Sequence, residues 1–577
     1  MYAGKSNPIK IPTVGDRGKL IIQKNGYIYF VTEAHWDKEK KRKVDNRVCI
    51  GKVDPENSEM MFPGKRFSEF FENTESFGEV ASVSDIVPME RKLKIGRINF
   101  SLSYLVYAVL DKAAEQTGLK LALQKSFPKF CKYILAVAIH AIAAESSTAQ
   151  LFPAWAYDNW CGLTTAISDS TISRIYAALG KEPSSIQEFF RIYCQEYHRV
   201  FPCSTERAVA FDSTNQVSES SGQKKAQYGK SKTAEKLPVI NTAMFVDENT
   251  GISLWYEHFD GNVLDKSQTP YSVEKAQQLG FKKLFLIVDR GYFSKKNMRS
   301  ISDLGFGFGM MVPETAKLVS ELIAKWKNEL KQNEKNYIAS ENIYGIQTTV
   351  TLESDEEYFA YVFYDNDTNY HECNAVHNQI NFFMKNAEER IRYSDKMREF
   401  YAERGIIVTK IEGQDKTTKR NFTLSVDPLK VQKAYEEAGF FVILSNRLMS
   451  AENMIRISRK RDYSEKAFRH LKSHFGLSRT YTHTDESFCG KMFTSFIALV
   501  ILQSFRWLMR DFFAIKTSET TATLIAELGK YRIIERKDGT WMPVYAMNKK
   551  QKALLKAVNL TEEVIEECIR TVKIRRY

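Results

Sequence analysis

Three acidic residues, Asp212, Asp289 and Glu465, stand where their carboxylates could act together. Asp212 closes the apolar run AVAF, and Asp289 closes the run LFLIV at 284–288. Short apolar runs followed by turn-forming residues predict buried strands. Carboxylate oxygens are the ligands that hard divalent cations prefer. The pattern therefore predicts two strand-terminal acids and a third, more distant acid that bind metal together.

The third acid lies in a strongly basic segment, SRKRDYSEKAFRHLKSHFGLSR, at 458–479. At about 100° per residue of a continuous α-helix, one narrow stripe contains Ser458, Arg461, Glu465 and Lys472. A burying face beside the stripe is formed by Ile457, Ala467, Phe468, Leu471 and Phe475. An acid between an Arg one turn earlier and a Lys two turns later suits a surface that holds a metal and a phosphodiester. The alternative is a solvated charged face on an amphipathic helix.

The order of apolar runs predicts the elements that position the acids. Strands are expected at 207–212, 239–246 and 252–259, then a helix from Thr269–Pro270 to Gly280, a strand at 284–288, a helix, and a strand at 306–312. This is the order of a ribonuclease H-like α/β core. If the first and fourth strands are neighbours, Asp212 and Asp289 lie side by side, where they repel unless a cation neutralises them.

With these residues the sequence resembles bacterial insertion-sequence DDE transposases of the branch with a Tyr-x2-Arg-x3-Glu-x6-Lys signature. The match is Arg461-x3-Glu465-x6-Lys472, with Asp212 in FDST and Asp289 in VDRGYF. The N-terminal segment GYIYFVTEAHWDKEKKRK…IGKVDPE at 26–56 also looks like the start of these proteins, and EKAFRHLKS at 465–473 is similar to them as well. Ser458 occupies the signature Tyr position, so a ring that helps hold the DNA end is missing or supplied elsewhere, for example by Tyr292, Phe293 or Trp160.

The resemblance implies a DNA transposase that cuts and joins DNA at the ends of an insertion sequence. Two Mg²⁺ ions, for which Mn²⁺ can substitute, are expected on Asp212, Asp289 and Glu465. Arg461, Lys472 and the Ser458 position are expected to contact DNA, both at terminal inverted repeats and at a target. The resemblance also implies a homodimer that brings two ends together, in the cytoplasm of a bacterium and on its nucleoid.

Two other functions stay open on the residues alone. One is a stand-alone metal-dependent nuclease on the same core, and the other is a domesticated DNA-binding protein that no longer cuts. The intact acids argue against the second. A large N-terminal helical region and a long insertion argue against a minimal nuclease.

Composition agrees with a polyanionic partner. The chain has 577 residues and a formal net charge of +13, with 43% hydrophobic residues, which is enough for several cores. Eight cysteines occur without a CxxC pair, so a reducing cytoplasm fits better than a disulfide framework. The apolar runs at 133–144 and 496–505 are too short to span a membrane and predict buried helices.

The chain divides into six predicted regions. They are a strand-rich module at 1–92, a helical DNA-binding region at 93–205, a first part of the core at 206–315, a mixed α+β insertion at 316–449, the rest of the core at 450–513, and a helical C-terminal region at 514–577. Residues 163–179 resemble a helix-turn-helix, although an ordinary capped helix fits equally well. The loop with Lys230 and Lys232 is either a solvated loop or a DNA clamp.

Three further patterns have ordinary explanations. HECNAVH at 371–377 offers only three ligands for zinc. The alternating glycines at 305–309 lack the following helix of a dinucleotide-binding loop. Asp260 and Asp265 precede a helix and are expected to act in a turn or a cap.

Overall fold

The computed structural model describes residues 8–12, 19–37, 42–64, 66–71, 101–230, 235–352, 356–385, 394–410, 422–515, 518–536 and 538–574. The chain forms two compact units. One comprises residues 1–100 with 535–540, and the other comprises 101–534 with 541–577.

The first unit is built on a five-stranded antiparallel sheet in the order β1-β5-β4-β3-β2. Its elements are β1 (Ile9–Lys10), β2 (Lys19–Ile22), β3 (Tyr27–Asp37), β4 (Arg42–Asp54), β5 (Asn57–Pro63) and the short helix α1 (Ser68–Phe71). Ile28, Phe30, Ile50, Met61 and Phe71 make its buried core.

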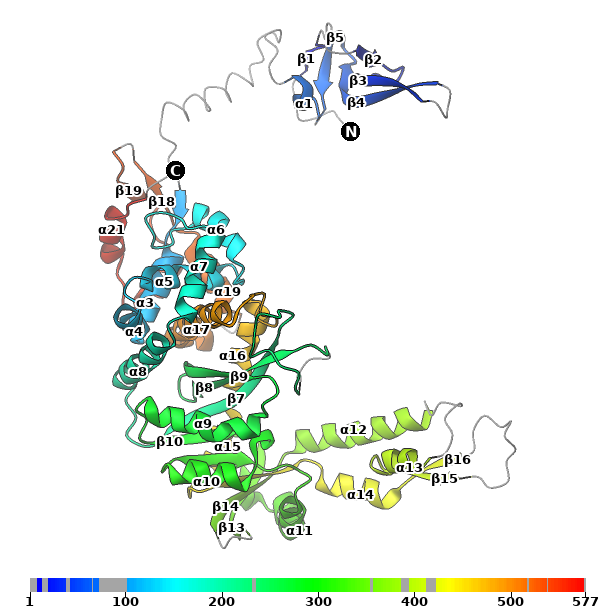
Figure 1. The fold of residues 1–577 in the computed structure, drawn as a ribbon, viewed down its shortest axis with the longest axis vertical. Helices are drawn as coiled ribbons and strands as arrows, with labels where there is room; N and C mark the ends of the chain where they lie inside the picture. Colours follow the sequence, from blue (N-terminus) through cyan, green and yellow to red (C-terminus); the bar gives the residue numbers. More distant parts are fainter. Residues whose placement is uncertain are drawn as a thin grey trace. The chain divides into compact units, whose positions relative to one another are not determined.

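A helical layer makes up one part of the second unit. Its helices are α3 (Leu105–Gln116), α4 (Leu119–Ser126), α5 (Cys131–Ala143), α6 (Phe152–Asp158), α7 (Asp169–Gly180), α8 (Pro183–Val200) and α17 (Asp485–Leu508), with the turn η2 (Ala149–Leu151). Helix α17 packs against α3, α5 and α7 (Figure 1). The connection from α6 to α7 has ten residues, longer than the three- or four-residue turn of a helix-turn-helix.

Helix α17 is the central helix of this layer. Among the described residues it is the one helix long and apolar enough to cross a membrane, with a mean hydropathy of 1.6. However, 89% of that window is buried inside the protein. The run predicted as a buried helix at 496–505 is therefore the C-terminal half of a longer core helix.

The centre of the second unit is a nine-stranded sheet in the order β12-β13-β14-β17-β11-β10-β7-β8-β9. The five strands predicted for the first part of the core are all present. They are β7 (Arg207–Val217), β8 (Val239–Asp247), β9 (Ser253–Asp260), β10 (Leu284–Val288) and β11 (Gly307–Met311). β10 pairs in parallel with both β7 and β11, whereas β8 pairs in antiparallel fashion with both β7 and β9. Helices α9 (Asp265–Gln278) and α10 (Lys295–Asp303) make the two crossovers.

Helix α9 begins at Asp265, five residues before the predicted first helical residue, and contains Pro270. That prediction took Pro270 as the first helical residue. Pro is tolerated here in the second turn of the helix, where its ring forfeits one backbone hydrogen bond. The early start moves Asp265 from a loop into the first turn of the helix.

The predicted insertion joins the same sheet. Its elements are α11 (Lys317–Gln332), η4 (Glu334–Asn336), β12 (Tyr337–Ile338), β13 (Ile343–Thr351), β14 (Glu357–Tyr364), α12 (Asn366–Lys385), α13 (Asp395–Ala402), β15 (Ile406–Lys410), β16 (Phe422–Val426), α14 (Pro428–Glu437) and β17 (Phe440–Ser445). β17 pairs with β11 on one side and β14 on the other. The predicted boundaries at 316 and 449 therefore do not separate compact units, because ladder hydrogen bonds run across them. Figure 1 shows α12, α13, α14 and the β15–β16 hairpin as a lobe beside the sheet.

The C-terminal region contains both helices and strands. Its elements are α18 (Arg510–Ile515), α19 (Thr521–Gly529), β18 (Arg532–Glu535), β19 (Trp541–Pro543), α20 (Lys549–Ala557) and α21 (Glu562–Arg570). β18 pairs with β6 (Ser101–Ser103), so strand pairing joins this region to the start of the helical layer.

The two faces of the sheet are covered by different helices. Phe211, Phe245 and Trp255 stack on one face, next to Tyr292 and Phe281 from the α9–α10 side. Side chains alternate along a strand, so Asp212 points to the opposite face from Phe211. On that second face Tyr256 of β9 contacts Phe190 of α8 and Phe496 of α17.

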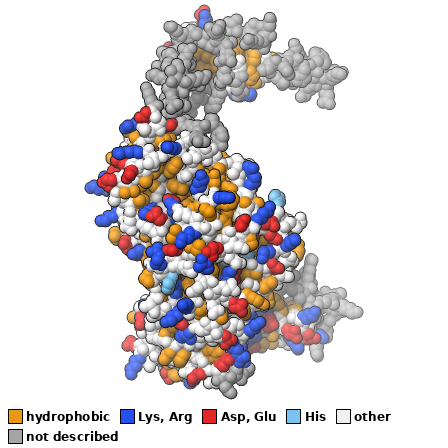
Figure 2. Space-filling view, turned by 60° about the vertical axis from the view of Figure 1, so that its left-hand side comes forward, with side chains coloured by type: hydrophobic (Ala, Val, Ile, Leu, Met, Phe, Trp, Pro, Cys, Tyr) orange, Lys and Arg blue, Asp and Glu red, His pale blue; other side chains and the backbone are white. Residues whose placement is uncertain are grey.

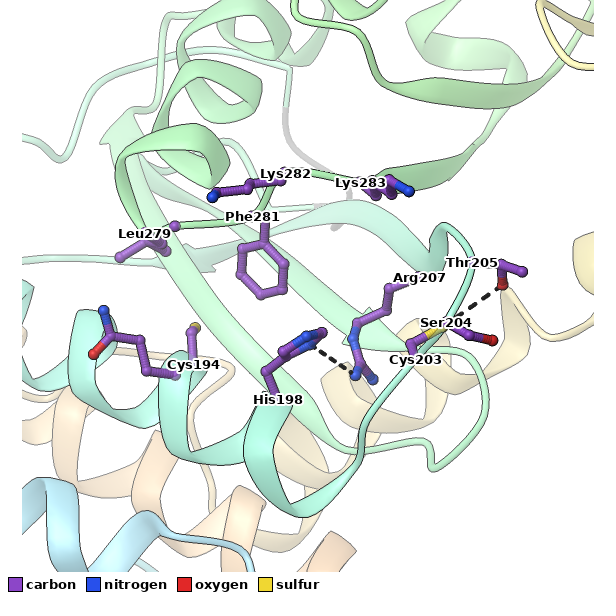
Figure 3. A pocket seen from close by; sticks show the side chains of 12 residues that line it. Cys194, His198, Cys203, Ser204, Thr205, Arg207, Leu279, Phe281, Lys282 and Lys283 are labelled. Carbon is purple, nitrogen blue, oxygen red and sulfur yellow. Dashed lines mark hydrogen bonds between the residues drawn. The ribbon is translucent and has the colours of Figure 1, made fainter.

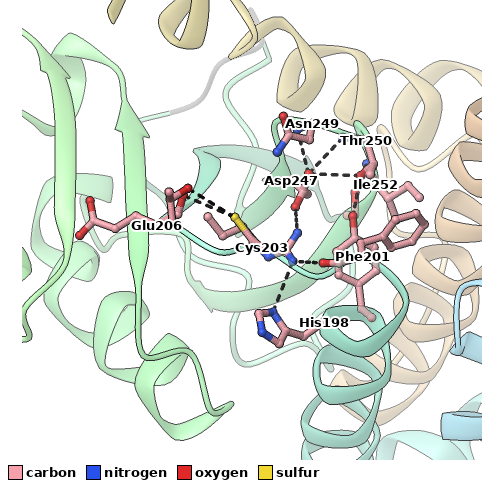
Figure 4. A network of polar contacts seen from close by, with 12 residues as sticks. His198, Phe201, Cys203, Glu206, Asp247, Asn249, Thr250 and Ile252 are labelled. Atoms are coloured by element: carbon pink, nitrogen blue, oxygen red, sulfur yellow. Dashed lines mark hydrogen bonds and ion pairs between the residues drawn. The ribbon is translucent and has the colours of Figure 1, made fainter. Parts of the chain in front are cut away.

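A buried ion pair fixes the start of β7 (Figure 4). Arg207 donates to Asp247, and the two side chains are only 4% and 0% exposed. Arg207 also donates to the carbonyl of Phe201 and lies over the ring of Tyr197. Asp247 Oδ1 accepts from the amides of Asn249 and Thr250 at 2.8 and 3.0 Å. The pair thus joins β7 to the β8–β9 turn and to the end of α8.

Removing one charge of this pair should destabilise the protein strongly. Asp247→Asn keeps an acceptor for the turn but leaves Arg207 buried without a counter-charge, so we expect a loss of about 3–5 kcal/mol in the free energy of unfolding. The double variant Arg207→Met/Asp247→Asn carries no buried charge and should recover at least half of that loss. Urea unfolding followed by circular dichroism measures both. Equal losses in the single and double variants would show that charge compensation is not what stabilises this junction.

Candidate active site

Asp212 and Asp289 are brought together by the parallel pairing of β7 with β10. The last residue pair in this ladder is Phe211 with Val288, and each acid is the next residue in its chain. The prediction that the first and fourth strands are neighbours is confirmed. The two carboxylates belong to adjacent strands at the same level of the sheet, and both residues are partly exposed.

The predicted end of β7 at Asp212 is wrong. The strand continues to Val217, because residues 212–217 pair with β8 down to Val239. Asp212 thus marks the point where β7 loses its parallel neighbour, and turn-forming residues such as Ser213 and Asn215 follow in the strand. The pairing with β8 overrides their local preference for a turn.

Local hydrogen bonds orient both aspartates. Asp212 Oδ1 accepts from the Ser213 amide at 2.7 Å, and Asp289 Oδ1 accepts from the Arg290 amide at 2.7 Å. Asp289 is the N-cap of the short helical turn η3 (Arg290–Tyr292). Both carboxylates are therefore bent toward their own backbone at the point where the β7–β10 ladder ends.

Glu465 lies on a shorter helix than predicted. The continuous helix assumed for 458–479 is wrong: α15 (Ala451–Arg459) ends, Lys460 and Arg461 form a turn, and α16 (Asp462–Arg469) follows. The segment then passes into a π-helix, η5 (His470–His474). The turn has i→i+3 bonds, such as Arg461 N to Ser458 O at 3.2 Å, and these change the angular position of the residues on either side.

Arg461 connects two of the three acids. Its Nη1 lies 2.6 Å from Asp289 Oδ1, and its Nη2 lies 3.2 Å from Glu465 Oε1. The predicted common face of Arg461 and Glu465 is thus observed across the helix start. The side chains of Arg461, Asp289 and Glu465 are 25%, 35% and 50% exposed, so the ion pairs are open to solvent.

The donor chemistry of the three acids fits a hard divalent cation, since every donor is a carboxylate oxygen. In this arrangement a guanidinium stands between Asp289 and Glu465. Consistent with that, within the described ranges no group of three or more His, Cys, Asp or Glu side chains is close enough to hold one ion. The three carboxylates would have to move closer together to hold one ion.

The other predicted contact residues lie on nearby elements. Ser458 is half-buried in the last turn of α15, and Lys472 is half-buried in η5. Lys230 is exposed, and its carbonyl accepts from Asn215 Nδ2 at 3.2 Å, which holds the basic loop beside the second half of β7. Lys232 lies outside the described residues.

Sequence reasoning missed the surroundings of Tyr292. Burial, followed by the negative charges of Asp212 and Asp265, raises the pKa of the Tyr292 phenol well above its usual range, so this phenol stays protonated. Tyr292 is only 3% exposed, which rules out its ring as a platform for a DNA base in this arrangement. A sequence prediction that started this helix at Asp265 would have placed Asp265 near Asp212 and Asp289.

A pocket of about 470 Å³ opens at the other end of the same strands (Figure 3). His198, Cys203, Arg207, Phe281 and Lys283 are among the residues that line it, and none of its lining residues is a carboxylate. This pocket therefore lacks the carboxylate ligands that a hard divalent cation prefers. Figure 2 shows basic and acidic side chains interspersed over the face in view, so the net charge of +13 does not by itself mark a binding surface there.

Comparisons with known proteins identify the same region of the chain. A family model described as "Transposase DDE domain" matches residues 204–501, which contain all three acids. No curated protein sequence matches the chain. A cryo-EM structure of a piggyBac transposase synaptic complex with hairpin DNA is 7% identical over 77% of this chain and 76% of that chain, with a TM-score of 0.32. At that score the likeness carries no weight here.

The family match extends from just before β7 into α17 and covers more than half of the 577 residues. It therefore includes the paired strands that carry Asp212 and Asp289, and the helix that carries Glu465. On this evidence the chain belongs to the Transposase DDE domain family, whose members are enzymes that cleave DNA and transfer its strands.

Proposed function

We propose that this protein is the transposase of a bacterial insertion sequence, which moves the element by cut-and-paste transposition. The observation that carries the proposal is the position of Asp212 and Asp289 side by side where the β7–β10 ladder ends, with Glu465 joined to Asp289 through Arg461. The family match over the same residues supports it. Its substrate is DNA, both the terminal inverted repeats at the ends of the element and the target DNA into which the element is inserted.

The core of the proposal is a ribonuclease H-like arrangement. The order β11-β10-β7-β8-β9, with β10 parallel to β7 and β11 and the remaining pairs antiparallel, supports it. In this arrangement an acid within the first strand lies beside the acid that follows the fourth, and a later helix supplies the third from one face.

Transposases of this family use divalent metal ions. We infer two Mg²⁺ ions, replaceable by Mn²⁺, with Asp212, Asp289 and Glu465 as the residues that would hold them. When bound, such ions supply activation of the attacking oxygen and stabilisation of the leaving oxygen. The attacking oxygen is first that of water and then the freed 3′ hydroxyl of the element.

We assign a role in DNA binding to the remaining site residues. Arg461 and Lys472 would bind phosphates on either side of the scissile bond and set its register against the acids. Ser458 would lie on the path of the DNA end, and the loop with Lys230 and Lys232 would clamp the backbone. Two ends must be handled together, so we propose a homodimer. The protein would act in the cytoplasm, on the nucleoid.

Loss of any one acid should abolish cleavage but not DNA binding. We expect Asp212→Ala, Asp289→Ala and Glu465→Ala each to reduce strand cleavage by on the order of a thousandfold, because metal stabilisation of the transition state is lost. The assay is nicking of a plasmid that carries the gene with its flanking DNA, in Mg²⁺ and in EDTA. Asp462→Ala, on the same helix but ion-paired with Lys466, is the matched control and should stay active.

The same assay separates the alternative functions. A transposase yields joined products, a stand-alone nuclease yields cuts without joining, and a domesticated binding protein yields neither. Full Mg²⁺-dependent nicking by Glu465→Ala would remove this residue from the catalytic set.

Lys472 should contribute to DNA binding through its positive charge and should have no role in binding metal. Lys472→Ala is expected to weaken DNA binding and to lower the slope of log affinity against log salt by about one, as for one lost phosphate contact. Lys335→Ala, an exposed lysine beside β12 at the far edge of the sheet, is the control. Filter binding over a range of KCl concentrations measures both. An unchanged slope for Lys472→Ala would place η5 away from the DNA.

A further inference from the structure

Arg461 occupies an unusual place among the arginines near the acids. Its neighbours in sequence and space have partners outside the acid cluster: Arg290 pairs with Glu314, and Arg459 pairs with Glu341. Arg461 alone among these three directs both ends of its guanidinium at candidate metal ligands. Its Nη1 forms an ion pair with Asp289, and its Nη2 forms one with Glu465.

The physical reason is the repulsion between carboxylates that the fold forces together. Asp212 and Asp289 are fixed by the β7–β10 ladder, and Glu465 is brought beside them by α16. Without metal, this group needs a cation to offset its charge. A guanidinium is planar and forked, so separate nitrogens can each pair with a different carboxylate in a fixed geometry, whereas a lysine ammonium is a single point charge.

The same carboxylate oxygens are needed for metal. A divalent ion held by Asp289 and Glu465 would compete with the guanidinium, because the two cations repel each other and because Arg461 already uses one oxygen of each carboxylate. We propose that Arg461 is an internal counter-cation that closes the acid site of the metal-free protein, and that metal binding releases it to a DNA phosphate. This inference rests on the proposed function.

The local structure lets the side chain move without disturbing the helices. Arg461 lies in the two-residue turn between α15 and α16, and its amide is held by the Ser458 carbonyl at 3.2 Å. The backbone anchor is thus separate from the guanidinium. The side chain is 25% exposed, and Glu465 is 50% exposed, so solvent reaches both partners.

The arrangement couples metal to DNA. Metal displaces Arg461 from the acids, and a free guanidinium is then available to a phosphate. By linkage, DNA that holds Arg461 must in turn favour metal binding by the same factor. Metal-free protein would bind DNA with one phosphate contact fewer than metal-loaded protein.

The first test is metal affinity, measured by electron paramagnetic resonance of free Mn²⁺ with the full chain. Arg461→Gln removes the competing cation, so we expect it to bind Mn²⁺ about threefold to tenfold more tightly than wild type, consistent with two solvent-exposed ion pairs. Arg290→Gln is the matched control, since it removes a positive charge next to Asp289 that is paired with Glu314. Its affinity should stay within about twofold of wild type because solvent and salt screen that charge.

A second measurement uses stability and does not depend on metal titration. In EDTA, Arg461→Gln should melt at a lower temperature than wild type, because its carboxylates are no longer offset. Mn²⁺ should raise its melting temperature by more than it raises that of wild type. Arg461→Lys keeps a charge without the fork and should fall between the two, which guards against a variant that simply folds poorly.

The third measurement is the salt dependence of binding to a short DNA duplex of mixed sequence, in EDTA and in Ca²⁺. The difference in slope between wild type and Arg461→Gln should be about one in Ca²⁺ and about zero in EDTA. An equal difference under both conditions would mean that Arg461 contacts phosphate whether or not metal is present, and would overturn the coupling.

The outcomes separate this inference from the proposed function. If wild type binds Mn²⁺, Asp289→Ala does not, and Arg461→Gln binds no more tightly than wild type, then the metal site stands and the counter-cation role is refuted. If neither wild type nor Arg461→Gln binds Mn²⁺, the metal site itself fails, and the inference fails with it.

Discussion

The parallel ladder between β7 and β10 is the constraint on which the candidate site depends. It ends at Phe211 and Val288, and it leaves Asp212 and Asp289 at neighbouring positions. A shift of one residue in either strand would turn a carboxylate to the other face and a core residue toward solvent. The stacked rings of Phe211, Phe245 and Trp255 oppose such a shift, so packing on one face sets the position of the acid on the other.

Placing these carboxylates close together increases the electrostatic repulsion between them. Backbone pairing holds two carboxylates side by side where the β7–β10 ladder ends, and a third approaches from α16. Arg461 offsets part of that charge from the turn between α15 and α16. Its backbone is held by the Ser458 carbonyl, so the anchor of this residue is separate from the guanidinium that pairs with the acids.

Contacts away from the acids also hold the strands of this sheet in place. β17 pairs with both β11 and β14, so the predicted insertion extends the sheet. At the opposite end of β7, the buried Arg207–Asp247 pair fixes the strand to the β8–β9 turn. Both features hold the strands that carry the aspartates, although neither lies at the acids.

The sequence by itself determined the three acids, the apolar runs that became β7 to β11, and their order, because side-chain periodicity and chain order are local properties. It also placed Arg461 one turn before Glu465. Tertiary structure decided the rest. β7 runs past Asp212 because β8 supplies hydrogen bonds that outweigh turn propensity, and α15 breaks at Lys460–Arg461 although the helical period continues. The pairing of Arg461 with Asp289 joins residues 172 positions apart, and only the packing of α16 on the sheet brings them within 2.6 Å.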